Sequence, residues 1–174
     1  AHGGSLMLSA SALATLDYCD AAERGEVLDP KRPKRVVLAV DIDIRQHNRD
    51  AILAHPMASR IEMIQGSSID AGVVERVRRR VEGAPRVLVL LDSNHTHEHV
   101  LAELEAYAEL TSVGSYCVVF DTIVEALPAD ASPDRPWGPG NSPGSAVREF
   151  LETHPEFVVD DEVDRRHLIS VAPG

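Results

Sequence analysis

The stretch RVLVLLDSNHTHEHV, residues 86–100, decides the predicted fold. After Arg86 comes an unbroken apolar run of Val and Leu, which is typical of a strand buried on both faces of a parallel sheet. The run ends at Asp92, and a helical pattern follows from about Thr96 to Leu110. A buried strand that leads into a helix is characteristic of α/β architectures. The stretch therefore predicts an α/β protein.

The same alternation extends along the rest of the chain. Further β-rich runs lie at residues 36–40, 60–64, 115–120 and 167–171. Helices are expected at about 5–23 and 45–54, from a cap at Ser68 or Asp70 to Gly83, and from Pro143 to Thr153. This order predicts a doubly wound, mostly parallel sheet with helices on both faces. With 174 residues, 44% of them hydrophobic, the chain is expected to form a single domain, residues 1–174.

Composition and charge exclude several classes of partner. The net charge of −11 argues against nucleic acid, because an acidic protein repels phosphate backbones. The most apolar N-terminal stretch, residues 6–16, is too short for a membrane span. Cys19 and Cys117 are too few and too far apart for a disulfide framework or a zinc knuckle. We therefore expect a cytoplasmic protein without nucleic acid as a partner and without a membrane span.

One segment interrupts the alternation of strands and helices. Residues 125–142 contain four prolines, two glycines and the only tryptophan, Trp137, so they cannot form a regular helix or an interior strand. Loops of this length in compact domains are often lids or binding loops. We interpret the segment as a lid, with a surface excursion as the alternative.

Three aspartates follow predicted strands directly: Asp41, Asp92 and Asp121. Parallel strands deliver their carboxyl ends to one edge of the sheet, where ligands bind, so these carboxylates are expected to gather there. Each could instead cap a turn or helix. Asp41 has the place of the acid that binds ribose hydroxyls in nucleotide-binding sheets, with Asp43 as a competitor.

Small residues precede two of the predicted helices. Gly3, Gly4 and Ser5 lead into the first, where a ligand could approach the backbone and the helix N-terminus. Gly66, Ser67 and Ser68 follow the strand at 60–64 and suit either an adenine edge or a capped turn.

The histidines at 95, 97 and 99 raise the question of a zinc site. An HxHxH array scatters its rings around a helix, and no cysteine lies nearby, so the spacing argues against three histidine ligands. We interpret Asp92 and His95 as facing the ligand edge, with His95 as a candidate general base. His97 and His99 are expected to decorate or cap the helix.

Several stretches occur together in one order: HGGS (2–5), VDID (40–43), QGSS (65–68), LDSNHTHEHV (91–100), GSYCVVFDTIVEALP (114–128) and RPWGPGNSPGSAVREFL (135–151). With them the sequence resembles the cephalosporin hydroxylase/rhamnosyl O-methyltransferase family over nearly its whole length. The resemblance implies a Rossmann-like class I methyltransferase fold that binds S-adenosyl-L-methionine. It also implies methyl transfer to a hydroxyl of a sugar or polyhydroxy natural product, in lipopolysaccharide or antibiotic biosynthesis.

By this resemblance, the cofactor-binding residues lie in the first third of the chain. Gly3, Gly4 and Ser5 belong to the loop facing the methionine portion. Asp41 contacts the ribose, and residues 66–68 lie at the adenine end. The strand that precedes the glycine loop in the family is absent here, so the resemblance implies an N-terminally truncated domain that lacks its first strand.

The resemblance also assigns the chemistry to the strand-end acids. Asp92 becomes a magnesium ligand or a carboxylate that orients substrate, Asp121 a second magnesium ligand, and His95 the general base. Metal-binding relatives carry two adjacent acids after the strand at 115–120, whereas this chain has Phe120 followed by Asp121. One of the implied ligands is therefore replaced.

Two other functions remain open from the residues alone. An acid after a strand also marks NAD(P)-binding oxidoreductases, although the complete GxGxxG fingerprint is absent. A non-catalytic nucleotide-binding module is the other alternative. The sequence also leaves a homo-oligomer open.

Overall fold

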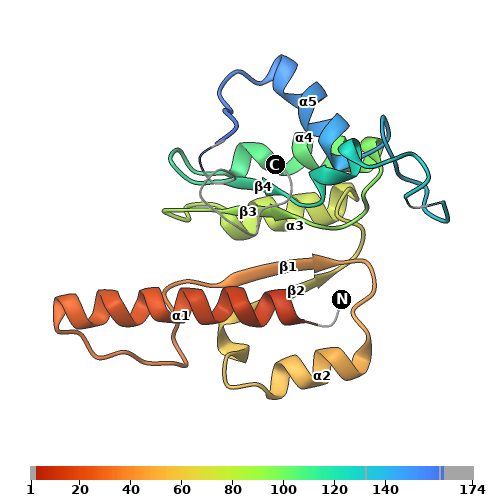
Figure 1. The fold of residues 1–174 in the computed structure, drawn as a ribbon. Coiled ribbons are helices and arrows are strands. Elements are labelled where there is room, and N and C mark those ends of the chain that lie inside the picture. The colour runs from red at the N-terminus through yellow and green to blue at the C-terminus, as the bar shows by residue number, and fades with distance from the viewer. Residues whose placement is uncertain (1–2, 132, 161, 163–174) are drawn as a thin grey trace. The chain divides into compact units, whose positions relative to one another are not determined.

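The computed structural model describes residues 3–131, 133–160 and 162, and the chain divides into two compact units (Figure 1). Unit 1 comprises residues 1–73 and unit 2 comprises residues 74–174. Each unit contains one pair of parallel strands. The strand predicted at 167–171 lies outside the described residues.

Unit 1 is a parallel strand pair with two helices packed against it. Its elements are α1 (Gly4–Arg24), β1 (Val37–Asp41), α2 (Gln46–Ala54), the short 3-10 helix η1 (Ala58–Arg60) and β2 (Ile61–Gln65). Val37 lies opposite Ile61 and Asp41 opposite Gln65. Ala10 of α1, Ile52 of α2 and Ile61 form the buried core. One face of each helix therefore packs on the strand pair, while Leu8, Leu16 and Leu53 stay exposed.

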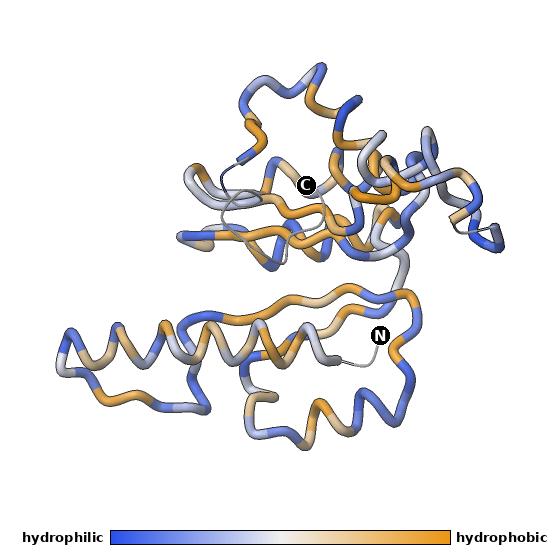
Figure 2. The backbone as a smooth tube through the Cα atoms, viewed as in Figure 1, coloured by the Kyte–Doolittle hydropathy of each residue, from blue (hydrophilic) through white to orange (hydrophobic). Residues whose placement is uncertain are grey.

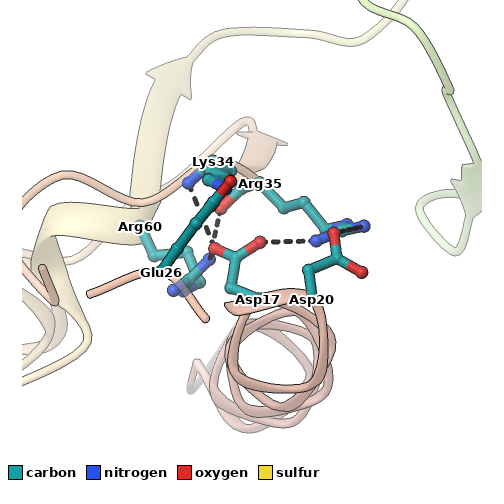
Figure 3. Close-up of polar contacts among 6 residues, drawn as sticks. All are labelled: Asp17, Asp20, Glu26, Lys34, Arg35 and Arg60. Carbon is teal, nitrogen blue, oxygen red and sulfur yellow. Dashed lines mark hydrogen bonds and ion pairs between the residues drawn. The ribbon is translucent and has the colours of Figure 1, made fainter. Parts of the chain in front are cut away.

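A buried ion cluster fixes α1 to the segment before β1 (Figure 3). Asp17 is fully buried and accepts hydrogen bonds from Arg35 Nη1 and Arg60 Nη1, both at 2.6 Å, and from the Lys34 backbone N–H. Burial by itself raises the pKa of Asp17, but the hydrogen bonds from Arg60, Arg35 and Lys34 outweigh it and hold that pKa below its ordinary value. The cluster connects three segments that are distant in sequence.

Unit 2 has the same strand-pair plan with different helices. Its elements are β3 (Val89–Leu91), α4 (His97–Tyr107), η2 (Ala108–Leu110), β4 (Cys117–Val119), η3 (Thr122–Ala126) and α5 (Pro143–Thr153). The helix α3 (Ala71–Val81) runs from unit 1 into unit 2. β3 and β4 are mostly hydrophobic, as is β1 (Figure 2). Val89 pairs with Cys117 and Leu91 with Val119.

The interior of unit 2 forms where α4 packs on α5. Val100 and Leu104 of α4 and Ala146 and Phe150 of α5 are buried. The helix α5 begins with a capping box, because the Ser142 hydroxyl accepts the Ser145 N–H and the Ser145 hydroxyl accepts the Ser142 N–H. These local and tertiary contacts account for the predicted helix after residue 142.

The structure confirms the predicted mixed α/β architecture with parallel pairing, which is compatible with a methyltransferase fold. Helices begin and end close to their predicted bounds. The strand predicted at 86–91 is shorter, because the Val87 N–H bonds the Ser112 hydroxyl at 2.8 Å rather than a neighbouring strand. The described residues form two strand pairs, so the full doubly wound sheet stays a prediction. Within those residues, every helix is too short or too polar to cross a bilayer.

Candidate functional site

Three ionisable side chains meet where β3 and β4 of unit 2 end. Asp92 follows β3 directly, and Asp121 comes two residues after β4. His95 Nε2 lies 3.5 Å from Asp92 Oδ1 and 3.4 Å from Asp121 Oδ2. One potential ligand atom from each residue lies within 4.8 Å of the others. The parallel register, with Leu91 opposite Val119, explains why residues so distant in sequence converge.

The backbone at Asp121 adopts an unusual conformation for the chain. Asp121 has φ 57° and ψ 29°, in the left-handed region that aspartate tolerates better than most residues. Its carbonyl accepts the Val124 N–H and begins η3. Such conformations cost free energy and concentrate at functional sites. The chain therefore turns sharply at one of the three cluster residues.

Exposure differs among the three cluster residues. The His95 side chain is 18% exposed, whereas the Asp92 and Asp121 side chains are 57% and 51% exposed. Phe120, which stands where the family resemblance has a second acid, is 43% exposed. A mostly covered imidazole between two half-exposed carboxylates can accept a proton or contribute to a cation site.

The segment 125–142 places its tryptophan against the cluster. The Trp137 and His95 rings have centroids 5.0 Å apart and planes tilted by 58°, and Arg135 lies 5.0 Å over the indole. The ends of the segment are joined by Glu125, which accepts the Ser142 hydroxyl at 2.6 Å and the Gly140 N–H at 2.9 Å. The Ser142 hydroxyl foremost, and then the Gly140 N–H, hold the pKa of Glu125 below its usual value. The interpretation of this segment as a lid stays a prediction.

The other two histidines of the array contact different partners. His97 Nδ1 lies 2.8 Å from the Ser145 hydroxyl and its Nε2 3.1 Å from Glu149 Oε2, so it joins α4 to α5. His99 Nε2 lies 3.6 Å from Glu103 Oε1. The three rings of the array therefore have different surroundings. The expectation that His97 and His99 only decorate or cap the helix understated their packing.

Glu103 is a residue that sequence reasoning missed. It lies on α4, is 2% exposed, and accepts the Ser93 hydroxyl at 2.7 Å on Oε1. Its buried Oε2 has no hydrogen-bond partner. Burial foremost, and then the charge of Glu103, raises the pKa of Tyr107 to about 12. A charged residue within the apolar stripe of Val100, Leu104 and Tyr107 was the available sequence signal.

The glycine-rich start of unit 1 has a conformation suited to close backbone approach. Gly3 precedes α1 with φ 82°, and a Cβ there would lie 3.2 Å from Ile52 Cδ1. No side chain caps this helix end, and the first N–H groups of a helix lack intrahelical acceptors. Gly4 and Ser5 form its exposed first positions. In Figure 1 this helix end lies toward the side to which β1 and β2 point.

A second set of candidates meets at the end of the β1–β2 pair. The Gly66 N–H donates to the Asp41 carbonyl at 3.0 Å, so Asp41 and residues 66–68 share one edge of unit 1. A Cβ on Gly66 would lie 2.6 Å from Val73 Cγ2. Asp41 Oδ1 accepts the Asp43 N–H at 2.9 Å, which fixes the turn after β1. Their proposed roles in binding remain predictions.

The capping contacts that the sequence assigned to Ser68 or Asp70 come from Asp70. Its Oδ1 accepts the backbone N–H groups of Gly72 and Val73 at 2.9 and 3.1 Å. These contacts fix the first turn of α3. Residues 66–68 therefore form the turn before the cap.

Comparison with known proteins gives the family. The family model described as Rhamnosyl O-methyltransferase/CmcI matches residues 1–174. Curated proteins named Rhamnosyl O-methyltransferase from Mycobacterium bovis (strain BCG / Pasteur 1173P2) and Mycobacterium tuberculosis (strain ATCC 25618 / H37Rv) are each 31% identical over 113 residues, 64% of this chain and 44% of the relative. The match thus spans less than half the length of those relatives. No solved structure matches the chain significantly. The chain belongs to the Rhamnosyl O-methyltransferase/CmcI family.

Proposed function

We propose that the protein is an S-adenosyl-L-methionine-dependent O-methyltransferase acting on a hydroxyl of a sugar or polyhydroxy natural product. The observation that carries the proposal is His95 Nε2 held between two strand-end carboxylates, in a chain that matches the family over its whole length. The matched relatives are named for a rhamnosyl acceptor, which makes a deoxyhexose the first acceptor to test.

Unit 1 is the proposed cofactor-binding region. S-adenosyl-L-methionine, when bound, supplies an electrophilic methyl group on a sulfonium. Gly3, Gly4 and Ser5 would receive its carboxylate at the uncapped start of α1, where backbone N–H groups favour an anion. Asp41 would accept hydrogen bonds from the ribose hydroxyls, and residues 66–68 would lie along the adenine. The positive φ of Gly3 supports this assignment.

Unit 2 carries the proposed acid–base chemistry. An alcohol is a poor nucleophile until its proton is removed, so a base must take that proton as the oxygen attacks. His95 Nε2 would accept the proton of the acceptor hydroxyl, whose oxygen would take the methyl group that the sulfonium supplies, with the sulfur leaving as a neutral thioether. Asp92 and Asp121 stabilise the imidazolium that results, and Asp92 also orients the acceptor hydroxyl.

The same cluster fits a divalent cation in part. Two carboxylates and an imidazole are ligands for Mn²⁺ or Fe²⁺, whereas Mg²⁺ prefers oxygen ligands alone. Asp92 and Asp121 would hold the ion and His95 would complete the set. A cation would supply positive charge for acceptor oxygens. Because one nitrogen cannot bind a cation and take a proton together, metal binding and base catalysis by His95 compete.

Calorimetry with S-adenosylhomocysteine tests the proposal. The intact protein is expected to bind it, and Asp41→Asn is expected to weaken binding about tenfold, because a carboxylate accepts the ribose hydroxyls more strongly than an amide. His95→Ala is the matched control and should bind normally. If the folded protein does not bind S-adenosylhomocysteine but binds NADH in a fluorescence titration, the result would instead support an oxidoreductase.

A further inference from the structure

The geometry points to Glu103 as a positioning residue that holds the Asp92–His95 turn through Ser93. Ser93 is the residue directly after Asp92, and its hydroxyl donates to Glu103 Oε1 at 2.7 Å. The bond connects the turn after β3 to the interior of α4. The positioning role does not depend on the proposed function, but the chemistry assigned to the cluster of Asp92, His95 and Asp121 does.

The surroundings of Glu103 are costly for a carboxylate. The residue is 2% exposed, and His99 Nε2 is 3.6 Å from Oε1, too far for a strong hydrogen bond. The second oxygen is buried with no hydrogen-bond partner. Burying a charged or unsatisfied oxygen costs free energy, so an apolar side chain at this position would suit the helix better. Glu103 therefore does not stabilise the helix, and its role must lie in the hydrogen bond that it accepts from Ser93.

Through Ser93, Glu103 contacts the turn at residues 92–95, which carries two of the three cluster residues. Asp92 directly precedes Ser93 and His95 follows two positions after it, and both reach the cluster with Asp121. The turn has other contacts as well, such as the Thr96 N–H on Asn94 Oδ1 at 3.0 Å and the His95 ring against Trp137. A hydrogen bond from the turn into the helix interior fixes its orientation relative to α4. Outer contacts of this kind orient the groups that bind ligands.

A positioning role and a stabilising role predict opposite results for Glu103→Leu. If Glu103 serves stability, the variant unfolds at lower temperature. If Glu103 positions the turn, the apolar side chain continues the stripe of Val100, Leu104 and Tyr107, and stability is kept or raised while the cluster loosens. Thermal unfolding and cluster geometry must therefore be measured on the same protein.

The geometry of the cluster can be followed by NMR on the intact chain. Trp137 is the only tryptophan, and its ring lies 5.0 Å from His95, so the indole shifts the His95 ring-proton resonance. His95→Gln assigns that resonance, and Trp137→Leu, which removes the aromatic ring, measures the shift due to the indole. In Glu103→Leu and Ser93→Ala the indole-dependent shift is expected to fall by at least half. Glu103→Gln keeps an oxygen acceptor for Ser93 and is expected to restore the shift.

Glu105→Gln is the matched control, since it removes the same charge from an exposed position of the same helix. It should leave the His95 resonance unchanged. Ser93→Ala and Glu103→Leu should combine without a further loss of shift, because they break the same bond. A normal His95 shift in Glu103→Leu, or additive losses in the double variant, would overturn the inference.

Titration with Mn²⁺ separates this inference from the proposed function. If the wild-type protein binds Mn²⁺, Glu103→Leu should weaken binding about tenfold, as is common when an outer contact is lost. If the folded protein does not bind S-adenosylhomocysteine, the proposed function fails, while the NMR shifts still decide the role of Glu103. Unchanged Mn²⁺ affinity in a binding protein would count against positioning.

Discussion

The ends of the two strand pairs differ in what they present. In unit 1 the end of β1–β2 combines Asp41 with Gly66, whose backbone N–H bonds the Asp41 carbonyl. In unit 2 the end of β3–β4 gathers Asp92, His95 and Asp121 as side chains. The same parallel pairing thus yields one edge shaped by backbone and one lined with ionisable groups. Under the proposed function, unit 1 would bind the cofactor through close backbone approach and Asp41, whereas unit 2 would supply the base and its carboxylates.

Replacing the His95 imidazole should have the largest effect, on the rate of methyl transfer. If the rate did not change, the contrast between the two units would fail. His95→Ala is expected to lower the rate of methyl transfer about 10²- to 10⁴-fold, the range for loss of a general base. Release of S-adenosylhomocysteine with a panel of glycosides that includes rhamnosides measures the rate. Affinity for S-adenosylhomocysteine should stay the same. A parallel loss of affinity would place His95 in cofactor binding instead.

The buried cluster of unit 1 predicts the next largest effect, on stability. Asp17→Asn is expected to cost about 3 kcal/mol of unfolding free energy, because Arg60 keeps its charge in a buried site without a carboxylate. Since the folded-state pKa of Asp17 lies below its ordinary value of 3.8, its contribution is complete above that pH and is lost as pH falls through the lowered pKa.

Urea unfolding at pH 7 and between pH 4 and pH 2 checks this prediction. The loss of stability with acid should be shallower in Asp17→Asn than in the wild type. Asp43→Asn is a suitable control, because that carboxylate is 67% exposed and lies 3.6 Å from Arg45. If the unfolding free energy falls equally with pH in the wild type and in Asp17→Asn, Asp17 does not contribute to the acid dependence of stability.

A smaller effect is expected from adding one methyl group to the edge of unit 1. Gly66→Ala places a Cβ 2.6 Å from Val73 Cγ2 at a φ of 153° that L-residues rarely adopt. The cost should be about 2 kcal/mol. Thermal unfolding measures it, with Gly138→Ala as the control because nothing lies within 4 Å of a Cβ there. If Gly66→Ala were neutral, the edge would not depend on backbone shape.

The smallest predicted effect concerns the segment 125–142. Glu125→Gln weakens the bonds to Ser142 and Gly140 that join the ends of the segment, at a cost of about 1 kcal/mol. Because Trp137 is the only tryptophan, acrylamide should quench the fluorescence of the protein more strongly in this variant. Glu152→Gln, an exposed change on α5, should leave quenching unchanged. Unaltered quenching in Glu125→Gln would show that other contacts hold the indole.

The features that sequence predicted are those set by local pattern. Asp92 and Asp121 could be expected at one edge because each ends an apolar run in a parallel arrangement. The cap at Asp70 and the start of α5 at Pro143 also follow from short-range rules. Such signals depend on a few neighbouring residues, which is why the sequence reveals them.

Other features depend on contacts between distant residues. Asp17 becomes an anchor only because Arg60, 43 positions later, reaches it. Glu103 stands beside the apolar stripe of α4, but only the tertiary packing shows that it is buried and accepts the Ser93 hydroxyl. The sharp backbone at Asp121 has no sequence signal, since most aspartates after strands are extended or helical. These features follow from tertiary packing, which periodicity and propensity do not encode.

The left-handed backbone at Asp121 inverts the usual order of conservative replacement. Asparagine readily occupies this region, whereas glutamate, which keeps the charge, does not. Asp121→Glu thus keeps the carboxylate but disfavours the left-handed backbone. Asp121→Asn keeps the backbone conformation but removes the carboxylate. Aspartate alone meets both demands, so a single position ties the course of the chain to the electrostatics beside His95.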